Sequence, residues 1–255
     1  MVGEIKTARR FDDRVENYAA HRPGYPAGVP DFLRGELGLT HASVVADVGS
    51  GTGILSEMLL REGCAVFAVE PNAAMRAAAE SRLMRYPNFT SVAGAAEATT
   101  LEAGSVDFVT AAQAFHWFDV EGARAEFRRI LRPGGRAVLI WNNRRTGANA
   151  FLRDYESLLR RFGTDYARVA ATYAEPESLR RFFGGGYGAR SFDNFQLFDF
   201  EGFKGRLLSA SYVPLAGHAD FEPMLAELRR VFDAHERGGR VRVEYDTEVY
   251  YGRPD

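Results

Sequence analysis

The first half of the chain alternates short apolar runs with segments whose apolar positions recur every three or four residues. Short apolar runs bounded by turn residues predict buried strands, and the longer recurrence predicts amphipathic helices. We predict strands over residues 43–49, 65–70, 89–94, 106–113 and 136–141. We predict helices over residues 54–63, 72–84 and 120–131. Strands that alternate with helices at this spacing predict a parallel sheet covered on both faces.

The second half follows a different pattern. Amphipathic periodicity predicts helices over residues 151–162, 176–183, 204–212 and 221–236. Alternating polar and apolar positions predict late strands over residues 193–204 and 240–253, and the glycines of 184–188 predict a flexible loop. We find no linker that divides the chain, so we expect one domain over 1–255. Its expected parts are an N-terminal lid (1–42), a ligand-binding core (43–141), a cap insertion (142–192) and C-terminal strands and helices (193–255).

The charge balance and the apolar content of the chain indicate which kinds of partner to expect. The 32 basic and 34 acidic residues give a net charge of −2, so no basic surface is expected to hold nucleic acid by neutralising phosphates. Cys64, the single cysteine, lies in an apolar run and is expected to be a buried small side chain. We find neither an apolar run of membrane-spanning length nor a signal peptide in the charged N-terminus, so we expect a cytoplasmic protein without membrane contact.

The sharpest motif is the run of residues 49–53, Gly-Ser-Gly-Thr-Gly, between a predicted strand and a predicted helix. Glycines there allow positive φ and a close approach of a ligand, and backbone N–H groups at the helix start favour a negatively charged group. Glu70, at the end of the next strand, is placed to accept hydrogen bonds from ribose hydroxyls. Ile54 stands where a dinucleotide fingerprint has its third glycine, and the Gly-Lys-Ser/Thr ending of a phosphate-binding P-loop is absent.

Three stretches together resemble the class I S-adenosylmethionine-dependent methyltransferases of the type 11 kind: DVGSGTG (47–53), VEP (69–71) and LRPGGRAVLIW (131–141). Two more, YAAHRPGYP (18–26) and AQAFHWFD (112–119), resemble the subgroup that includes trans-aconitate methyltransferase-like proteins. The resemblance implies an α/β fold, with a Rossmann-like, seven-stranded, mostly parallel sheet flanked by helices. It also implies an antiparallel C-terminal strand, a helical cap and S-adenosyl-L-methionine as cofactor.

The resemblance implies roles for cofactor-binding residues. The glycine run would pack against the methionine part of the cofactor, Asp47 would lie near its amino group, and Glu70 would bind the ribose. The implied cofactor-binding residues of this central part are Asp47, Gly49, Ser50, Gly51, Gly53, Glu70, Asn72, Ala95, Ala96, Glu97 and Gln113. Many relatives have an acid where Ala95 or Ala96 stands, so adenine recognition here is expected to use backbone groups, with Glu97. Tyr18 and Arg22 could close over the cofactor carboxylate, or could belong to an ordinary amphipathic helix.

The acceptor side of the site is expected around the ends of the fourth and fifth strands. His116 and Trp117 are the candidate catalytic residues, with His116 either a general base or part of the pocket wall. Trp141, Asn142 and Tyr25 are candidate substrate-binding residues, although an asparagine in this position could equally form a turn.

These features predict in-line transfer of a methyl group to an oxygen or nitrogen of a small carboxylate, phenol or heterocycle. No metal is expected, because the sequence has no metal-ligand motif such as HExxH or CxxC. The expected partner is a small acceptor, with no nucleic acid or membrane, and the chain is expected to be a monomer or homodimer. Two alternatives stay open: a non-catalytic S-adenosylmethionine-binding module, and an NAD-type oxidoreductase on a similar fold.

Overall fold

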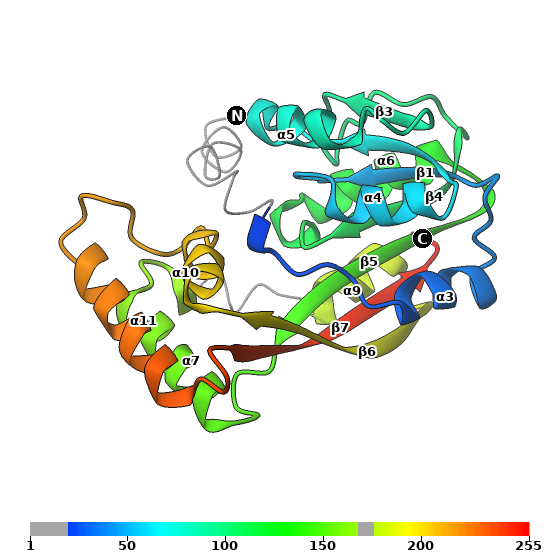
Figure 1. Cartoon of the computed structure of the whole chain (residues 1–255). Helices are drawn as coiled ribbons and strands as arrows, with labels where there is room; N and C mark the ends of the chain where they lie inside the picture. The colour runs from blue at the N-terminus through cyan, green and yellow to red at the C-terminus, as the bar shows by residue number, and fades with distance from the viewer. Residues whose placement is uncertain (1–19, 168–175, 255) are drawn as a thin grey trace.

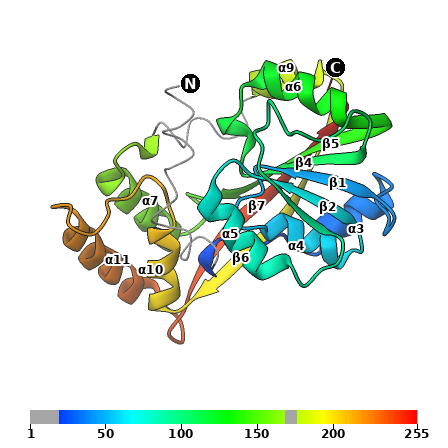
Figure 2. The same cartoon turned by 90° about the horizontal axis from the view of Figure 1, so that it is seen from above.

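The computed structural model describes residues 20–167 and 176–254. Within them one seven-stranded sheet has the order β3-β2-β1-β4-β5-β7-β6 (Figures 1 and 2). The strands are β1 (Val44–Val48), β2 (Ala65–Val69), β3 (Phe89–Val92), β4 (Val106–Ala112), β5 (Leu131–Arg144), β6 (Tyr187–Phe198) and β7 (Val241–Gly252). Neighbours from β3 to β5 pair in parallel, and β7 is antiparallel to both β5 and β6. The predicted fold class is confirmed.

Helices cover both faces of the sheet, as the buried strands predict. On one face lie α3 (Gly28–Gly35), α4 (Ile54–Arg61) and α5 (Ala73–Leu83), and on the other lie α6 (Val120–Ile130) and α9 (Pro176–Phe183) (Figure 2). Strand β5 shows why both layers form: Val138 and Ile140 belong to the first core, whereas Leu139 and Trp141 belong to the second.

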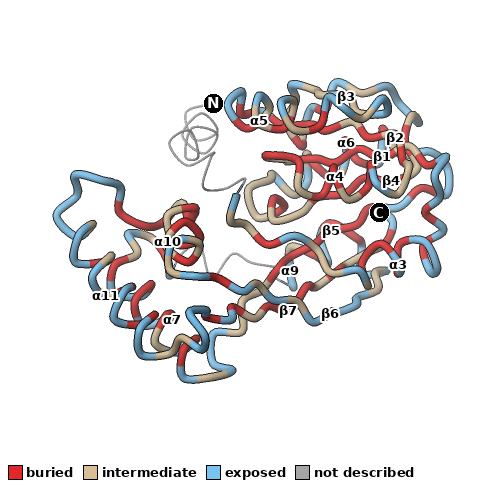
Figure 3. Tube along the Cα trace, in the orientation of Figure 1, coloured by how far each residue is buried: buried red, intermediate tan, exposed pale blue. Residues whose placement is uncertain are grey.

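A separate helical cap stands beyond one end of the long strands β5, β6 and β7 (Figure 1). It consists of α7 (Ala150–Phe162), α10 (Phe200–Leu208) and α11 (Phe221–His235). These helices bury their own apolar core together with Val241, Val243 and Tyr245 of β7, and Figure 3 shows this second buried interior. The cap therefore differs from the expected insertion of 142–192, because α9 packs on the sheet and α10 and α11 come from the C-terminal part.

Some element boundaries also differ from the predictions. Strand β6 begins at Tyr187, inside the expected glycine loop, because its first residues pair with the end of β7. Helix α10 begins at Phe200 rather than 204, because the Asp199 side chain accepts the N–H of Gly202 and starts the helix there. None of the helices in the described residues has the length and apolar character needed to span a membrane.

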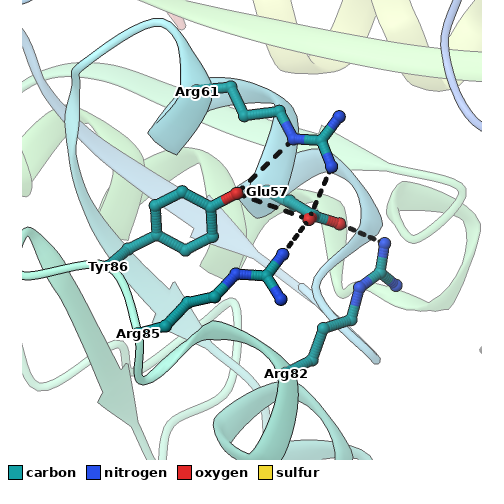
Figure 4. A network of polar contacts seen from close by, with 5 residues as sticks. All are labelled: Glu57, Arg61, Arg82, Arg85 and Tyr86. Carbon is teal, nitrogen blue, oxygen red and sulfur yellow. Dashed lines mark hydrogen bonds and ion pairs between the residues drawn. The ribbon is translucent and has the colours of Figure 1, made fainter.

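A polar network around Glu57 ties α4 to the end of α5 (Figure 4). The nearly buried carboxylate of Glu57 pairs with Arg61 at 2.9 Å, with Arg85 at 2.8 Å and with Arg82. Burial alone would raise the pKa of Glu57, but the arginines outweigh it and leave the pKa below its usual value. The network fixes the two helices that begin beside the glycine turn.

Candidate active site

A cavity of about 1010 Å³ opens at the carboxyl ends of the parallel strands and is bounded on its other side by the cap. Open α/β sheets bind ligands at this edge. On the sheet side it is lined by the glycine turn, the ends of β2 and β4, and the segment after β3. On the cap side the lining includes Arg144, Tyr166, Arg206, Tyr212 and Tyr245.

The glycine turn follows β1 directly, and Gly51 and Gly53 have different surroundings in it. All three glycines of the turn have positive φ: 68° at Gly49, 56° at Gly51 and 79° at Gly53. Gly51 lines the cavity, and a Cβ there would meet no other atom. Gly53 does not line the cavity; a Cβ there would stand 2.5 Å from Leu83 Cδ1 of α5. The structure therefore places Gly53 in helix packing rather than against a ligand.

Two hydroxyl groups of the same turn, Ser50 Oγ and Thr52 Oγ1, are available for hydrogen bonds to a ligand. Both are buried, both residues line the cavity, and neither hydroxyl has a hydrogen-bond partner among the described residues. Buried polar groups are ordinarily hydrogen-bonded. The turn thus offers polar atoms that a bound cofactor could satisfy.

Asp47, at the end of β1, lines the cavity with an almost fully buried carboxylate. It accepts hydrogen bonds from the hydroxyls of Ser56 at 2.6 Å and Thr110 at 3.0 Å. Burial raises the pKa of Asp47 to about 6, although the two hydroxyls oppose the shift. The sequence analysis missed Ser56 and Thr110, although Thr110 stands beside Asp47 in the register of β1 and β4.

Glu70 is fixed at the end of β2 by backbone donors. One oxygen accepts the N–H of Gly51 and the other that of Asn72, both at 2.9 Å. Asn72 also lines the cavity, but its side-chain oxygen caps α5 by accepting the N–H of Met75. Burial raises the pKa of Glu70, and the backbone donors lower it. The backbone N–H groups of Gly51 and Asn72 therefore fix the orientation of the Glu70 carboxylate, and the same hydrogen bond to Gly51 stabilises the glycine turn.

The predicted residues after β3 and β4 also line the cavity. Ala95 and Ala96 lie beside Glu97, whose carboxylate accepts the N–H of Asp119 at 2.8 Å. Gln113 has a φ of 55°, a left-handed conformation that is uncommon outside glycine, and its amide donates to the Asn142 carbonyl at 3.3 Å. This strained residue connects the ends of β4 and β5 at the cavity.

The two candidate catalytic residues are placed differently. Trp117 lines the cavity, whereas His116 does not; the His116 ring packs against the Trp117 ring at a tilt of 45°, with 4.8 Å between ring centroids. Burial, helped by the charge of Arg22, lowers the pKa of His116 to about 4. A neutral imidazole with so low a pKa is a weak base, which favours a pocket-wall role for His116.

Of the three candidate substrate-binding residues, two line the cavity and one does not. Tyr25 and Asn142 line the cavity, and Asn142 accepts the hydroxyl of Thr247 at 2.5 Å and donates to the Gly24 carbonyl at 3.3 Å. Trp141 does not reach the cavity: it is fully buried in the sheet core, packed edge-on against Phe115. Strand β5 continues past Trp141, which explains this correction.

The expected N-terminal lid is only partly described. Arg22 lines the cavity and donates to the Ser209 carbonyl of the cap at 2.9 Å, whereas Tyr18 lies outside the described residues. The sequence analysis missed two arginines of the cap wall, the buried Arg206 of α10 and the largely covered Arg144 at the end of β5, since arginine side chains are ordinarily exposed.

Comparisons with known proteins agree with this architecture. A model of the methyltransferase domain, type 11, matches residues 46–139. An uncharacterised methyltransferase of Mycobacterium tuberculosis is 38% identical over 168 residues, 65% of each chain. An uncharacterised methyltransferase-like protein of Schizosaccharomyces pombe is 35% identical over 142 residues, 55% of this chain and 53% of its own. The chain thus spans about half to two thirds of the length of these relatives.

Solved structures with the same fold are also found. A protein of Anaeromyxobacter dehalogenans, provisionally named a type II methyltransferase, is 27% identical with a TM-score of 0.66, covering 91% of this chain and 97% of its own. An S-adenosylmethionine-dependent methyltransferase of Geobacter sulfurreducens, solved with S-adenosyl-L-homocysteine, is 18% identical with a TM-score of 0.56, covering 97% and 98%. At that identity the second likeness concerns the fold.

Proposed function

Because a model of the methyltransferase domain, type 11, matches residues 46–139, we propose that the protein transfers a methyl group from S-adenosylmethionine to a small molecule. The acceptor atom would be an oxygen or nitrogen of a carboxylate, phenol or heterocycle. One observation carries the proposal: a single cavity is lined both by the glycine turn with Glu70 and by the tyrosines and arginines of the cap. Its volume is at the upper end of the ~300–1,000 Å³ usual for small-ligand pockets, which suits two ligands side by side.

The sheet side of the cavity has the groups that the cofactor needs. Glu70 would accept hydrogen bonds from the ribose hydroxyls, and Asp47 would face the amino group. Ser50 and Thr52 hold the buried hydroxyls that such a ligand could satisfy. Arg22, which lines the cavity from the N-terminal segment, would bind the cofactor carboxylate.

When bound, the cofactor supplies a methyl group on a sulfonium, which is already activated for displacement. The protein's task is therefore to hold the acceptor in line and to exclude water. Trp117, Tyr25 and Asn142 line the cavity where they could position the acceptor, and His116 supports Trp117 from behind. A carboxylate acceptor would need no base at all.

A turnover assay tests this proposal. The protein is incubated with S-adenosylmethionine and panels of carboxylates, phenols and nitrogen heterocycles, and release of S-adenosyl-L-homocysteine is followed. At a cofactor concentration near the wild-type dissociation constant, we expect acceptor-dependent release that Glu70→Ala strongly reduces and Glu102→Gln, an exposed control, leaves intact. Cofactor binding without release on any panel would favour the non-catalytic module, and binding of a nicotinamide cofactor instead would favour the oxidoreductase.

A further inference from the structure

The cap wall of the cavity contains two arginines with little solvent exposure and different partners: Arg206, which is buried, and Arg144, whose side chain is 10% exposed. Arg144 Nη2 lies 2.6 Å from the Glu156 carboxylate and 2.8 Å from the Tyr166 hydroxyl. Arg206 of α10 is only 8% exposed, yet no aspartate or glutamate oxygen among the described residues lies within ion-pair distance of it. Glu156 also pairs with the exposed Arg160 at 2.9 Å, so Arg144 shares a carboxylate inside the protein, whereas Arg206 has none in the part of the chain that the structure describes.

Hydrogen bonds orient the guanidinium of Arg206 but do not use all of its N–H donors. Its Nε donates to the Tyr245 hydroxyl at 3.2 Å, and Tyr245 in turn donates to the Gln196 side chain at 2.9 Å. Its Nη1 makes a long contact of 3.5 Å to Ser209 Oγ, and Nη2 makes no hydrogen bond within residues 20–167 and 176–254. Since Arg206 also lines the cavity, part of its planar donor fork is available to a ligand.

The phenol of Tyr155, which lies near Arg206, does not neutralise the charge of the guanidinium. Burial raises the pKa of Tyr155 to about 12, although Arg206 and Arg144 oppose the shift, so this phenol stays uncharged near neutral pH. A buried cation without a counter-ion is costly, and proteins ordinarily pair such a charge. The missing anion is therefore expected to arrive with a ligand.

We propose that Arg206 anchors a carboxylate of the methyl acceptor, which is a small organic acid with one free carboxylate and a flat body. This inference rests on the proposed function. A carboxylate matches the two-pronged geometry of a guanidinium. Tyr166, Tyr212 and Tyr245 line the same wall and offer aromatic surfaces for the body of the acid. One carboxylate is expected because Arg144 already has Glu156 and Arg22 is assigned to the cofactor.

The test titrates benzoate, phenylacetate, cinnamate and hexanoate, each beside its uncharged amide, into protein saturated with S-adenosyl-L-homocysteine. Citrate and glutarate serve as acids with more than one carboxylate. We expect at least one aromatic or conjugated monoacid to bind more tightly than its amide and than the polyacids. Arg206→Met should weaken the binding of that acid by about thirtyfold or more, because it removes one partner of a buried charge pair. Arg180→Met, at an exposed position of α9 outside the cavity, should leave it unchanged.

The results that overturn the inference are distinct from those that overturn the proposed function. Failure of every acid to bind, equal binding of acid and amide, preference for a polyacid, or acid binding that survives Arg206→Met would each contradict the inference. Loss of S-adenosyl-L-homocysteine binding in Arg206→Met would also contradict it, because Arg206 would then serve the cofactor carboxylate. Failure of wild type to bind S-adenosyl-L-homocysteine would instead contradict the proposed function.

Thermal unfolding of the free protein gives a readout that does not need an acceptor. Replacing an unmatched buried charge by an apolar side chain of similar length is expected to leave the melting temperature unchanged or raise it. The acid that binds wild type should then raise the melting temperature of wild type but not of Arg206→Met. A large fall in melting temperature of the free variant would show that the charge is compensated within the protein, contrary to the inference.

Discussion

The carboxylate of Glu70 accepts a hydrogen bond from the backbone N–H of Gly51, with 2.9 Å between oxygen and nitrogen. Gly51 lies in the turn after β1, and Glu70 ends the neighbouring parallel strand β2. The residue assigned to the ribose therefore also holds the turn assigned to the methionine part of the cofactor. The two halves of the cofactor site are coupled before any ligand binds.

The glycines of this turn should differ when each is replaced by alanine. Gly53→Ala combines positive φ with a 2.5 Å clash against Leu83, so we expect a loss of roughly 2–4 kcal/mol in free energy of unfolding. Gly51→Ala meets no neighbouring atom, so about 1 kcal/mol is expected from backbone strain. Urea unfolding of both variants measures the difference. Equal losses would contradict the assignment of Gly53 to helix packing.

The Glu57 network should make a pH-dependent contribution to stability. Because the pKa of Glu57 is lowered in the folded protein, its contribution is present above the unfolded pKa of about 4.5 and is lost as the pH falls through the folded value. We expect Glu57→Gln to lower the free energy of unfolding by about 2 kcal/mol near neutral pH.

Urea titrations near neutral pH and below about pH 4 check this expectation, with Glu102→Gln as an exposed control. The difference between wild type and Glu57→Gln should shrink at the lower pH. A difference that stays constant over this range would show that the ionised carboxylate is not what joins α4 to α5.

Cofactor affinity should fall in acid because of Asp47. The folded protein favours the protonated carboxyl of Asp47, because its pKa is raised to about 6. In the free protein this contribution to stability is complete below about pH 4 and is lost as the pH rises through about 6. Binding of the cofactor amino group favours the ionised carboxylate, so protons must be released when binding occurs below about pH 6. We expect affinity for S-adenosyl-L-homocysteine to fall by up to about tenfold per pH unit there.

Calorimetry between about pH 5 and pH 8 measures this dependence, and buffers of different ionisation enthalpy report the released proton. Asp47→Asn should weaken the binding of S-adenosyl-L-homocysteine and reduce the dependence of the affinity on pH. The dependence that remains should come from the titration of Glu70. Constant wild-type affinity across this range would contradict the proposed contact with Asp47.

The imidazole of His116 should titrate far below a free histidine. Burial and Arg22 lower its pKa to about 4, so NMR of the free protein should show the His116 ring neutral throughout the physiological range. Arg22→Met should raise this pKa, because it removes a nearby positive charge. His116→Gln assigns the signal among the five histidines. Titration of His116 near pH 6.5 would favour the general base over the pocket wall.

The fold of the core follows from local pattern. Each predicted strand and helix between Val44 and Ile130 is present within a few residues, because strands buried on both faces show as apolar runs and glycines mark the turns between them. A model of the methyltransferase domain, type 11, matches residues 46–139, the part of the chain that holds the glycine run and Glu70.

Long-range packing explains what pattern alone did not predict. Trp141 stands near the end of an apolar run, but β5 continues to Arg144, so the cavity begins at Asn142. Helix α9 has the same amphipathic pattern as α7, and only the tertiary structure shows that it covers the sheet rather than the cap. Arg206 looks like a solvated helix residue until Tyr245 of β7 is placed beside it.

Calorimetric titration of S-adenosyl-L-homocysteine into wild type and Glu70→Ala tests the central claim most directly. We predict one molecule bound per chain with an affinity on the order of micromolar. Glu70→Ala loses a charged acceptor and frees the Gly51 turn, so binding should weaken by about 2–3 kcal/mol, roughly 30- to 150-fold. Glu102→Gln should bind as wild type does. Failure of the wild-type protein to bind S-adenosyl-L-homocysteine, or equal binding by Glu70→Ala, would contradict the account of this site.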